Sequence, residues 1–406
     1  MTRNHAASIV AAIVVFYTGP CFAASAQPED SIVAAAKTKE WKAIDIRPFQ
    51  SAIHHAVMKF RGQKAPYEQY PPEKIIHIGE NILAYQNSGG GWPKNIDWTR
   101  VFSPEELTPL PHGGAGKPAG DSTFDNDNTW TQIGYLAQVY EQSHLQRYAD
   151  SALKGIDYIL AEQRPSGGWR GSDVDAITFN DGVMAGVLRT IKAAGGDTQL
   201  YSFVDDTRRA RAKAAYEKGI RCTLDCQIKV NGRLTAWCEQ HDHGDLKPIW
   251  ARTFEPPSIT PDESVDVVRV LMTIDNPLPE VVRAVQAAVA WFDKVKIPGI
   301  RIEKVPAEPV EFQFHYSDYE LVEVKDPNAP PIWARYYDLD TEKPIFCNRE
   351  RKITSTFAEL NRERRTGTAW YGYWPAKLLT KEYPRWQKRW APNDNVLTKP
   401  GANLAR

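Results

Sequence analysis

The sequence predicts a mainly α-helical protein whose helical hairpins pack as an α/α barrel or toroid. Two observations lead to this fold class: several segments repeat apolar residues at helical spacing, and two helices end in nearly the same glycine-rich turn. A third is that strands and helices do not alternate as they do in doubly wound proteins. The composition indicates a globular protein with a packed core, because 42% hydrophobic and 25% charged residues are near the average of globular proteins.

Apolar spacing defines the helical segments. Residues 147–163 place Tyr148 and Ile156 on one face, and residues 278–292 do the same with Val285. The same kind of pattern predicts three further helices, over residues 128–140, 181–194 and 207–219.

A repeat is visible in the turns that follow two of these helices. Residues 89–92 read Gly-Gly-Gly-Trp, and residues 167–169 read Gly-Gly-Trp. Glycine after a helix adopts the left-handed capping conformation, and the tryptophan can fold back over the helix end. We infer an internal repeat of helical hairpins whose Gly-Gly-Trp turns gather at one end of the barrel.

The pattern changes after residue 297. Prolines recur from Pro298 to Pro344 and prevent long helices, while residues 300–305 and 312–316 are typical of short strands or extended segments. We expect short strands and long irregular segments here, wrapping the helical core. The predicted organisation is a leader over 1–26, a single module over 27–390, with a helical core about 41–297 and a wrap about 298–390, and a tail over 391–406.

The first 26 residues have the pattern of a secretory signal peptide. Arg3 precedes an apolar run over residues 6–17, and small residues follow up to Ala26. The run is shorter than the ~20 residues of a transmembrane helix. We therefore expect a secreted protein, extracellular or periplasmic, that does not contact the membrane once the leader is cleaved.

Four cysteines remain after this leader, and an even number in an exported protein is compatible with one or two disulfides. Free thiols are the alternative, and the pairing does not follow from the sequence. A zinc site on three of them with His241 fits no standard spacing. The four are Cys222, Cys226, Cys238 and Cys347.

The charge balance excludes two classes of partner. The 50 basic and 50 acidic residues cancel, so no global field marks a nucleic-acid binder or a membrane-surface binder. No heptad pattern is present, and a monomer is the default expectation.

Acidic residues gather in two places that precede helices. Asp121, Asp125 and Asp127 lie within seven residues, together with asparagine amides, and such hard oxygen ligands are preferred by calcium. Helix capping is the alternative for this stretch. Asp181 opens the next helix after the second Gly-Gly-Trp turn, so Asp125 and Asp181 could converge on one ion or one substrate.

Arginines supply the opposite charge. Arg252 and Arg335 are flanked by aromatic residues, and six basic residues lie between Arg349 and Arg365. Most of such a run is usually a solvated helix face. Arginine is also the side chain suited to a forked contact with a carboxylate, so a cleft of this composition fits an acidic sugar chain.

Seven ordered stretches make a family resemblance specific. They are GGGWPKN (89–95), FDNDNT (124–129), TFNDGVM (178–184), WCEQHD (237–242), ARTFEPPS (251–258), WARYYDLDTEKPIFCNR (333–349) and ERRTGTAWYG (363–372). Together they span most of residues 45–380, and they resemble pectate lyases of polysaccharide lyase family ten.

The resemblance implies an activity and a metal. The expected reaction is calcium-dependent β-elimination of de-esterified homogalacturonan (polygalacturonate), which gives 4,5-unsaturated oligogalacturonides. Arg349 is the expected base that removes the C5 proton, and Arg335 is the alternative. Glu350 follows Arg349 where the family pattern has an aspartate. Since a free arginine titrates above pH ~12, we expect an alkaline optimum.

The resemblance also implies the remaining site residues. For the metal we expect Asp125 and Asp181 first, with Asp121 and Asp127 beside them. The residues expected to bind the uronate chain are Arg252, Arg335, Lys94, Asn126, Asn180 and Trp92.

Two other function classes stay open. An inverting glycoside hydrolase on an α/α scaffold would use two carboxylates ~6.5 to 9.5 Å apart, such as Asp125 and Asp181, and would need no metal. A non-catalytic protein that binds acidic polysaccharides would use the aromatic residues and arginines for recognition alone.

Overall fold

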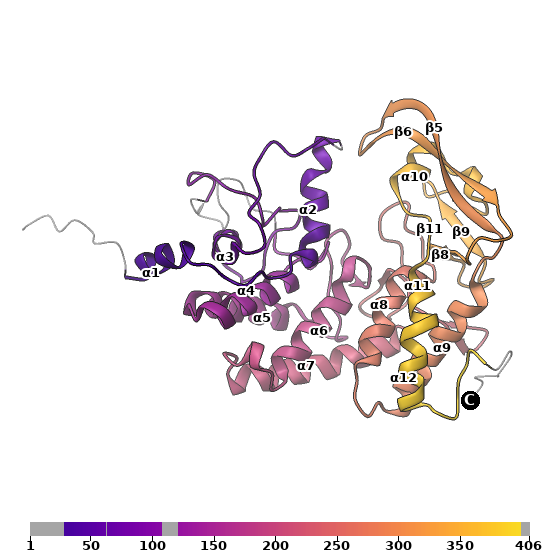
Figure 1. The fold of residues 1–406 in the computed structure, drawn as a ribbon. Helices are drawn as coiled ribbons and strands as arrows, with labels where there is room; N and C mark the ends of the chain where they lie inside the picture. The colour runs from indigo at the N-terminus through magenta and orange to yellow at the C-terminus, as the bar shows by residue number, and fades with distance from the viewer. Residues whose placement is uncertain (1–27, 62, 108–120, 399–406) are drawn as a thin grey trace, which may run out of the picture. The chain divides into compact units, whose positions relative to one another are not determined.

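The computed structural model describes residues 28–61, 63–107 and 121–398 (Figure 1). The chain divides into two compact units, Met1–Lys39 and Glu40–Arg406, and the described part of the first is helix α1 (Pro28–Lys37). The predicted signal peptide lies outside the described residues. Among the helices that are described, none is long and apolar enough to cross a membrane.

The Glu40–Arg406 unit contains the remaining helices and strands. Its α-helices are α2 (Gln50–Val57), α3 (Ile75–Ala84), α4 (Trp130–Ser143), α5 (Gln146–Glu162), α6 (Val183–Gly195), α7 (Asp206–Asp225), α8 (Pro261–Met272), α9 (Pro279–Val295), α10 (Arg362–Gly367), α11 (Trp374–Lys377) and α12 (Tyr383–Trp390). The five helices expected from apolar spacing are present as α4, α5, α6, α7 and α9.

Among the described residues, the strands form five antiparallel sheets. The longest strands are those of the hairpin of β5 (Ile300–Glu311) and β6 (Tyr316–Lys325). The other sheets pair β1 (Ile177–Thr178) with β4 (Gln240–His241), β2 (Lys229–Val230) with β3 (Arg233–Leu234), β7 (Trp333–Ala334) with β11 (Tyr371–Gly372), and β9 (Pro344–Cys347) with both β8 (Tyr336–Tyr337) and β10 (Ile353–Thr354).

The predicted fold class, a mainly helical α/α barrel, is wrong. Helices make up 44% of the structure and strands 13%. Within the Glu40–Arg406 unit, helices α3 to α9 follow one another as a row and do not close into a ring (Figure 1). Apolar spacing identifies the buried face of each helix, whereas the angle between successive hairpins depends on how side chains interlock at their contacts.

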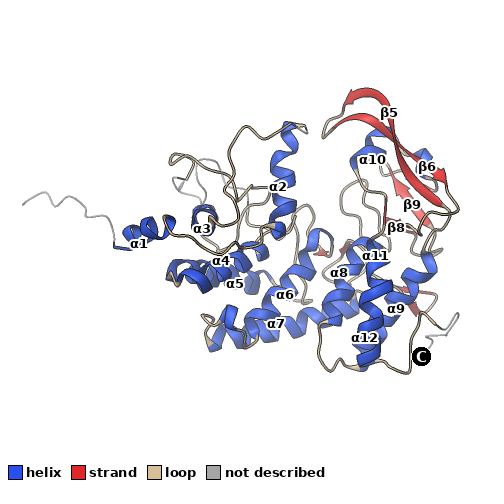
Figure 2. Cartoon of the chain, in the orientation of Figure 1, coloured by secondary structure: helices blue, strands red, loops and turns tan. Residues whose placement is uncertain are grey.

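The C-terminal strands also differ from expectation. Residues 300–305 lie in β5, but β5 and β6 are long strands that stand out in Figure 2. Residues 312–315 are the connection at the tip of this hairpin, and only Tyr316 of the predicted second segment begins a strand. The aromatic composition of residues 312–316 is typical of a strand, yet residues 312–315 form the turn.

The helix-end repeat is present and has a third copy. Trp92, Trp169 and Trp237 are fully buried, and each indole Nε1 donates to a carbonyl of the preceding helix. The acceptors are the carbonyls of Ile82, Ile159 and Thr223, at 2.7, 2.8 and 2.7 Å. Each tryptophan therefore folds back over the helix that it follows.

A glutamine completes each copy. The amide Nε2 of Gln163 donates to the carbonyls of Gly167 and Ala215, both at 2.8 Å, which ties the turn after α5 to α7. Gln86 and Gln227 make the equivalent pair of bonds from the other two turns. These amides, of which that of Gln227 is buried and the other two are half-buried, join successive hairpins and hold their Trp turns in place.

We expect Gln163→Ala to lower the free energy of unfolding by about 2 kcal/mol, because two buried carbonyls lose their donor. Urea unfolding at neutral pH measures the change. The matched control is Gln146→Ala in the same helix, whose exposed amide pairs only with Asp150 and which should change stability by less than about 0.5 kcal/mol. Equal effects of both substitutions would contradict a structural role of the repeat.

Candidate active site

The first acidic stretch is a buried turn attached to the first Trp turn. Asn126, Asp127 and Thr129 have positive φ of 55°, 57° and 65°. The side-chain amide of Asn128 donates to the carbonyls of Trp92 (2.6 Å) and Thr123 (3.0 Å). The turn thereby fixes the preceding Asp125, which is 7% exposed.

Asp125 and Asp181 meet in the structure. The backbone N–H of Asp127 donates to the carbonyl of Asp181 at 3.2 Å and joins the two loops. Burial together with the neighbouring Asp125 carboxylate raises the pKa of Asp181 well above its ordinary value. The Nζ of Lys94 forms an ion pair with Asp125. The amide of Asn180 donates to Asp181 Oδ2 at 3.0 Å and accepts from Gln240 at 3.0 Å. Two loops that each precede a helix thus converge on one buried carboxylate pair, as the sequence indicated.

The other residues expected around this pair are placed differently. Asp121 is exposed and lies near Tyr158, where its charge helps to raise the pKa of the Tyr158 hydroxyl. Asp127 faces Asp266 and Arg189, and burial raises its pKa to about 6. Asn126 donates to Asn95 at 2.8 Å, beside Lys94. Trp92 is fully buried over the end of α3, so it supports the turn and does not face a ligand.

Arg335 is held by three carboxylates. It donates to Glu239 Oε1 at 2.6 and 3.0 Å, to Asp262 at 3.3 Å and to Glu263 at 3.3 Å. Tyr336 also donates to Glu239, at 2.9 Å. These carboxylates raise the pKa of the Arg335 guanidinium well above its ordinary value, against the effect of burial. Arg335 therefore keeps its proton, and its guanidinium is paired with these carboxylates.

Sequence reasoning missed these three carboxylates. Glu239 lies inside the WCEQHD stretch, and Asp262 and Glu263 lie in the first turn of α8, where acidic residues are common for helix-dipole reasons alone. Asp181 interacts electrostatically with Glu239, Glu263 and Arg335. The Asp125–Asp181 pair and Arg335 therefore belong to one charged network.

A second group of arginines gathers on Phe254. The guanidinium carbons of Arg252, Arg349 and Arg364 lie 4.8, 4.6 and 4.0 Å from the centre of its ring. Arg252 is paired with Glu255 and interacts with Asp181, which links this cluster to the carboxylate pair. Arg349 donates to Glu363 from Nε at 3.1 Å and from Nη2 at 2.9 Å.

Arg364 is the functional candidate that sequence reasoning did not single out. Its side chain is 2% exposed, and its Nε has no hydrogen-bond partner among the described residues. Burial lowers its pKa to about 10, with the neighbouring Arg349 charge acting in the same direction. The signal was present in ERRTGTAWYG, but a basic run is normally a solvated face, and nothing local marks one arginine as buried.

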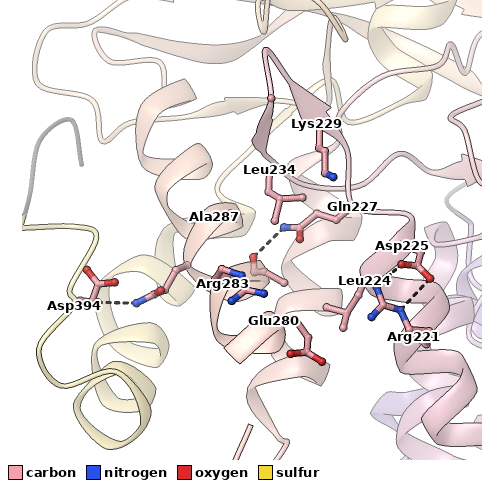
Figure 3. Close-up of a pocket in the computed structure, with 13 residues that line it drawn as sticks. Arg221, Leu224, Asp225, Gln227, Lys229, Leu234, Glu280, Arg283, Ala287 and Asp394 are labelled. Carbon is pink, nitrogen blue, oxygen red and sulfur yellow. Dashed lines mark hydrogen bonds and ion pairs between the residues drawn. The ribbon is translucent and has the colours of Figure 1, made fainter. Parts of the chain in front are cut away.

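Among the described residues the cysteines form no disulfide, and one cavity lies apart from these groups. Cys222, Cys226, Cys238 and Cys347 are buried free thiols, so the structure contains none of the disulfides considered for them. A cavity of about 770 Å³ lies beside α7, the β2–β3 hairpin and α9 (Figure 3). Its charged lining includes the Arg221–Asp225 pair (3.0 Å), and it contains none of the predicted site residues.

His241 is a buried structural group. Its Nε2 accepts from the backbone N–H of Cys238 at 3.1 Å, and its Nδ1 lies 2.8 Å from the carbonyl of Leu246. Both nitrogens are used by backbone, so the ring is neutral and has no lone pair for a metal. Burial lowers the pKa of His241 to about 4.

This pKa predicts acid sensitivity. Unfolded chains protonate histidine near pH 6.5, whereas the folded protein does so only near pH 4. The unfolded state therefore binds more protons in this window, and stability falls as the pH drops through it. We expect the loss between pH 7.5 and 4.5 to be smaller by about 2 to 3 kcal/mol in His241→Gln than in wild type, by urea unfolding. His243→Gln, at a half-exposed site, is the control and should leave the pH dependence unchanged; a wild-type profile in His241→Gln would refute the assignment.

The donor set around Asp125 fits a calcium ion only in part. No group of three or more His, Cys, Asp or Glu side chains with metal-binding geometry occurs in the described ranges. The two neighbouring carboxylates and nearby amide oxygens are hard ligands, and a divalent cation would relieve the repulsion between the two acids. Because calcium takes six to eight oxygens, substrate and water would have to supply the others.

Comparisons with known proteins agree on one family. A family model of pectic acid lyases matches residues 86–379. A solved structure of a family 10 polysaccharide lyase from Cellvibrio cellulosa is 28% identical, with a TM-score of 0.64, and the match covers 84% of this chain and 98% of that chain. A mutant of such an enzyme from the same organism, in complex with trigalacturonic acid, is 27% identical, with a TM-score of 0.64 and coverage of 84% and 99%. No curated protein is similar enough to count as a match.

Proposed function

The chain belongs to the pectic acid lyase family, and from this premise we propose that it cleaves polygalacturonate by calcium-dependent β-elimination with Arg349 as the base. It is a polysaccharide lyase. The observation that supports the site best is the meeting of Asp125 and Asp181, from two separate loops, in a network that also contains Lys94 and four arginines. Acidic and basic groups placed together in this way suit a polyanionic substrate held by arginines and a cation.

The uronate carboxylate is bound by cations of this chain. Arg252 is half-exposed and lies near Asp181, and Lys94 is paired with Asp125. Asp125 and Asp181 are the residues that would hold a calcium ion, and the ion would supply Lewis-acid withdrawal of charge from the uronate carboxylate, which would acidify the neighbouring C5 proton. Arg335, pinned by Glu239, keeps a fixed positive charge next to Asp181.

The elimination needs a base and a leaving group. Neutral Arg349 takes the C5 proton, the C5–H electron pair becomes the C4=C5 double bond, and the C4–O bond breaks toward the leaving oxygen. Water protonates that oxygen, and Arg349 returns its proton to solvent. Since arginine is mostly protonated at neutral pH, the rate should rise toward alkaline pH. Of the two arginines considered, we take Arg349 as the base, because three carboxylates hold the proton on Arg335 whereas one carboxylate, that of Glu363, pairs with Arg349.

The geometry does not favour the hydrolase alternative. Inverting glycosidases separate their two carboxyl groups by ~6.5 to 9.5 Å to leave room for water. Asp125 and Asp181 instead lie close enough for the Asp125 carboxylate to raise the pKa of Asp181, which is the arrangement of a shared cation site rather than of two separated catalytic acids.

We also infer how the protein is deployed. The secretory pattern of residues 1–26 supports export, extracellular or periplasmic, of a single catalytic module over 27–390 that acts as a monomer. Cleavage of the leader is testable by N-terminal sequencing of the exported protein, and the oligomeric state by light scattering.

The assay incubates the purified protein with polygalacturonate at alkaline pH, with calcium or with a chelator, and follows ultraviolet absorbance of the 4,5-unsaturated product. Calcium-dependent growth supports the proposal. New reducing ends without absorbance would indicate hydrolysis. Binding without either signal would indicate a recognition protein.

A further inference from the structure

The tip of the β5–β6 hairpin is fastened to α10 and lies beside the arginine cluster. The rings of Phe312 and His315 are 5.0 Å apart across the turn, and His315 Nε2 lies 2.9 Å from Thr366 Oγ1. A Cβ on Gly367 would lie 2.8 Å from the His315 ring, so this glycine allows the close approach. The tip is therefore seated on α10, the helix that carries Glu363 and Arg364.

Phe314 stands at this tip and is 55% exposed. Its ring centre is 4.5 Å from the guanidinium carbon of Arg349, whose opposite contact is Phe254 at 4.6 Å. Arg349 thus stacks on two aromatic rings, and its guanidinium nitrogens donate to the carboxylate of Glu363. An exposed phenylalanine costs solvation free energy, and here it lies directly on the proposed base.

An ion pair ties the same tip to the N-terminal half of the unit. Arg61, which follows the 3-10 turn Met58–Phe60, lies 2.9 Å from Glu311 at the end of β5. Figure 1 shows the hairpin tip beside the end of α2, where this contact lies. The two side chains are 62% and 48% exposed. Such a pair can change the equilibrium constant between two positions of the tip by only about fivefold or less.

We propose that the hairpin tip is a substrate-binding element of the lyase, in which Phe314 stacks against one galacturonate ring next to Arg349 and the Arg61–Glu311 pair keeps the tip in place. Sugar rings present apolar C–H faces that pack on aromatic rings, and Phe314 offers a free face there. This inference rests on the proposed function, because it takes Arg349 to lie at the reacting sugar. A weak, exposed ion pair suits an element that must lift to admit a long chain and then settle on it.

The first test is Phe314→Ala, assayed on polygalacturonate and on trigalacturonate. Stacking that is equal in the ground and transition states should raise KM by about fivefold and change kcat by less than about twofold. Loss of Arg349 positioning alone would instead lower kcat, and that result would overturn the proposal, as would an unchanged KM. Leu278→Ala, a 62% exposed apolar residue that precedes α9, is the matched control and should change neither constant.

The second test exchanges the ion pair. Arg61→Glu and Glu311→Arg should each raise KM on polygalacturonate by about two- to threefold, and the double variant should restore the wild-type value. Unchanged single variants, or a double variant that is no better than the singles, would overturn the role of the pair.

A calorimetric titration with trigalacturonate separates this inference from the proposed function. If wild type shows no calcium-dependent turnover, the proposed function fails, and the titration still decides the binding role of Phe314. About fivefold weaker binding by Phe314→Ala supports the role, and equal binding by both proteins overturns it.

Discussion

Arg349→Ala should lower kcat on polygalacturonate by about a thousandfold while the free energy of unfolding changes by less than about 1 kcal/mol. General base catalysis contributes about 10²- to 10⁴-fold, and no other side chain in the cluster has the same contacts. Arg364 is buried behind Phe254 and Arg335 is held by carboxylates. The stability change should stay small because the Arg349 side chain is about one-third exposed and because Glu363 keeps a second arginine, Arg364, at 3.8 Å.

Initial rates of ultraviolet absorbance at saturating calcium measure the effect. Lys352→Ala, at an exposed basic residue three positions along the chain, is the control and should keep wild-type kcat. Arg349→Lys separates charge from proton transfer: it should bind trigalacturonate as wild type does and still lose most of kcat. A rate above a tenth of wild type in Arg349→Ala would place the base elsewhere, and Arg364 would then be the next residue to replace.

The spacing of apolar residues predicted the positions of single helices. Apolar spacing is a property of a single helix, and the helices over 128–140 and 147–163 appear as α4 and α5. The third copy of the turn escaped notice because Trp237 follows a β2–β3 hairpin and no Gly-Gly pair. Its defining hydrogen bond is visible only in three dimensions.

The acidic loops were predicted and their partners were not. Asp125 and Asp181 each lie before a helix at the same end of successive hairpins, so their meeting follows from the repeat. Glu239 and Glu263 meet Arg335 over 96 and 72 residues of chain, and no local spacing encodes that contact. The prediction of a barrel is wrong for the same reason. Closure of a ring depends on the angles between hairpins rather than on the sequence pattern within one hairpin.

The carboxylate pair leads to the second large effect: Asp181→Asn should lower kcat by about a thousandfold and make the calcium-free protein more stable. Burial and the neighbouring Asp125 carboxylate both disfavour the charged form of Asp181, so this carboxyl group costs the folded protein stability at neutral pH. Asparagine keeps the shape and can keep the contact with Asn180 but removes the charge. The gain should be about 1 kcal/mol in urea unfolding with a chelator present.

Calcium should reverse that order. A ligand that binds only the folded state stabilises it by about 2.7 kcal/mol at one hundred times its Kd, so wild type should gain stability with calcium and Asp181→Asn should not. Asp121→Ala is the matched control, since Asp121 belongs to the same acidic stretch as Asp125 but is exposed and apart from the pair. It should keep both the calcium response and kcat. Calcium stabilisation that survives in Asp181→Asn, or disappears in Asp121→Ala, would mean that the ion binds elsewhere. The Asp125–Asp181 pair would then destabilise the calcium-free protein and stabilise the calcium-bound one. A site selected for binding rather than for folding should show this behaviour.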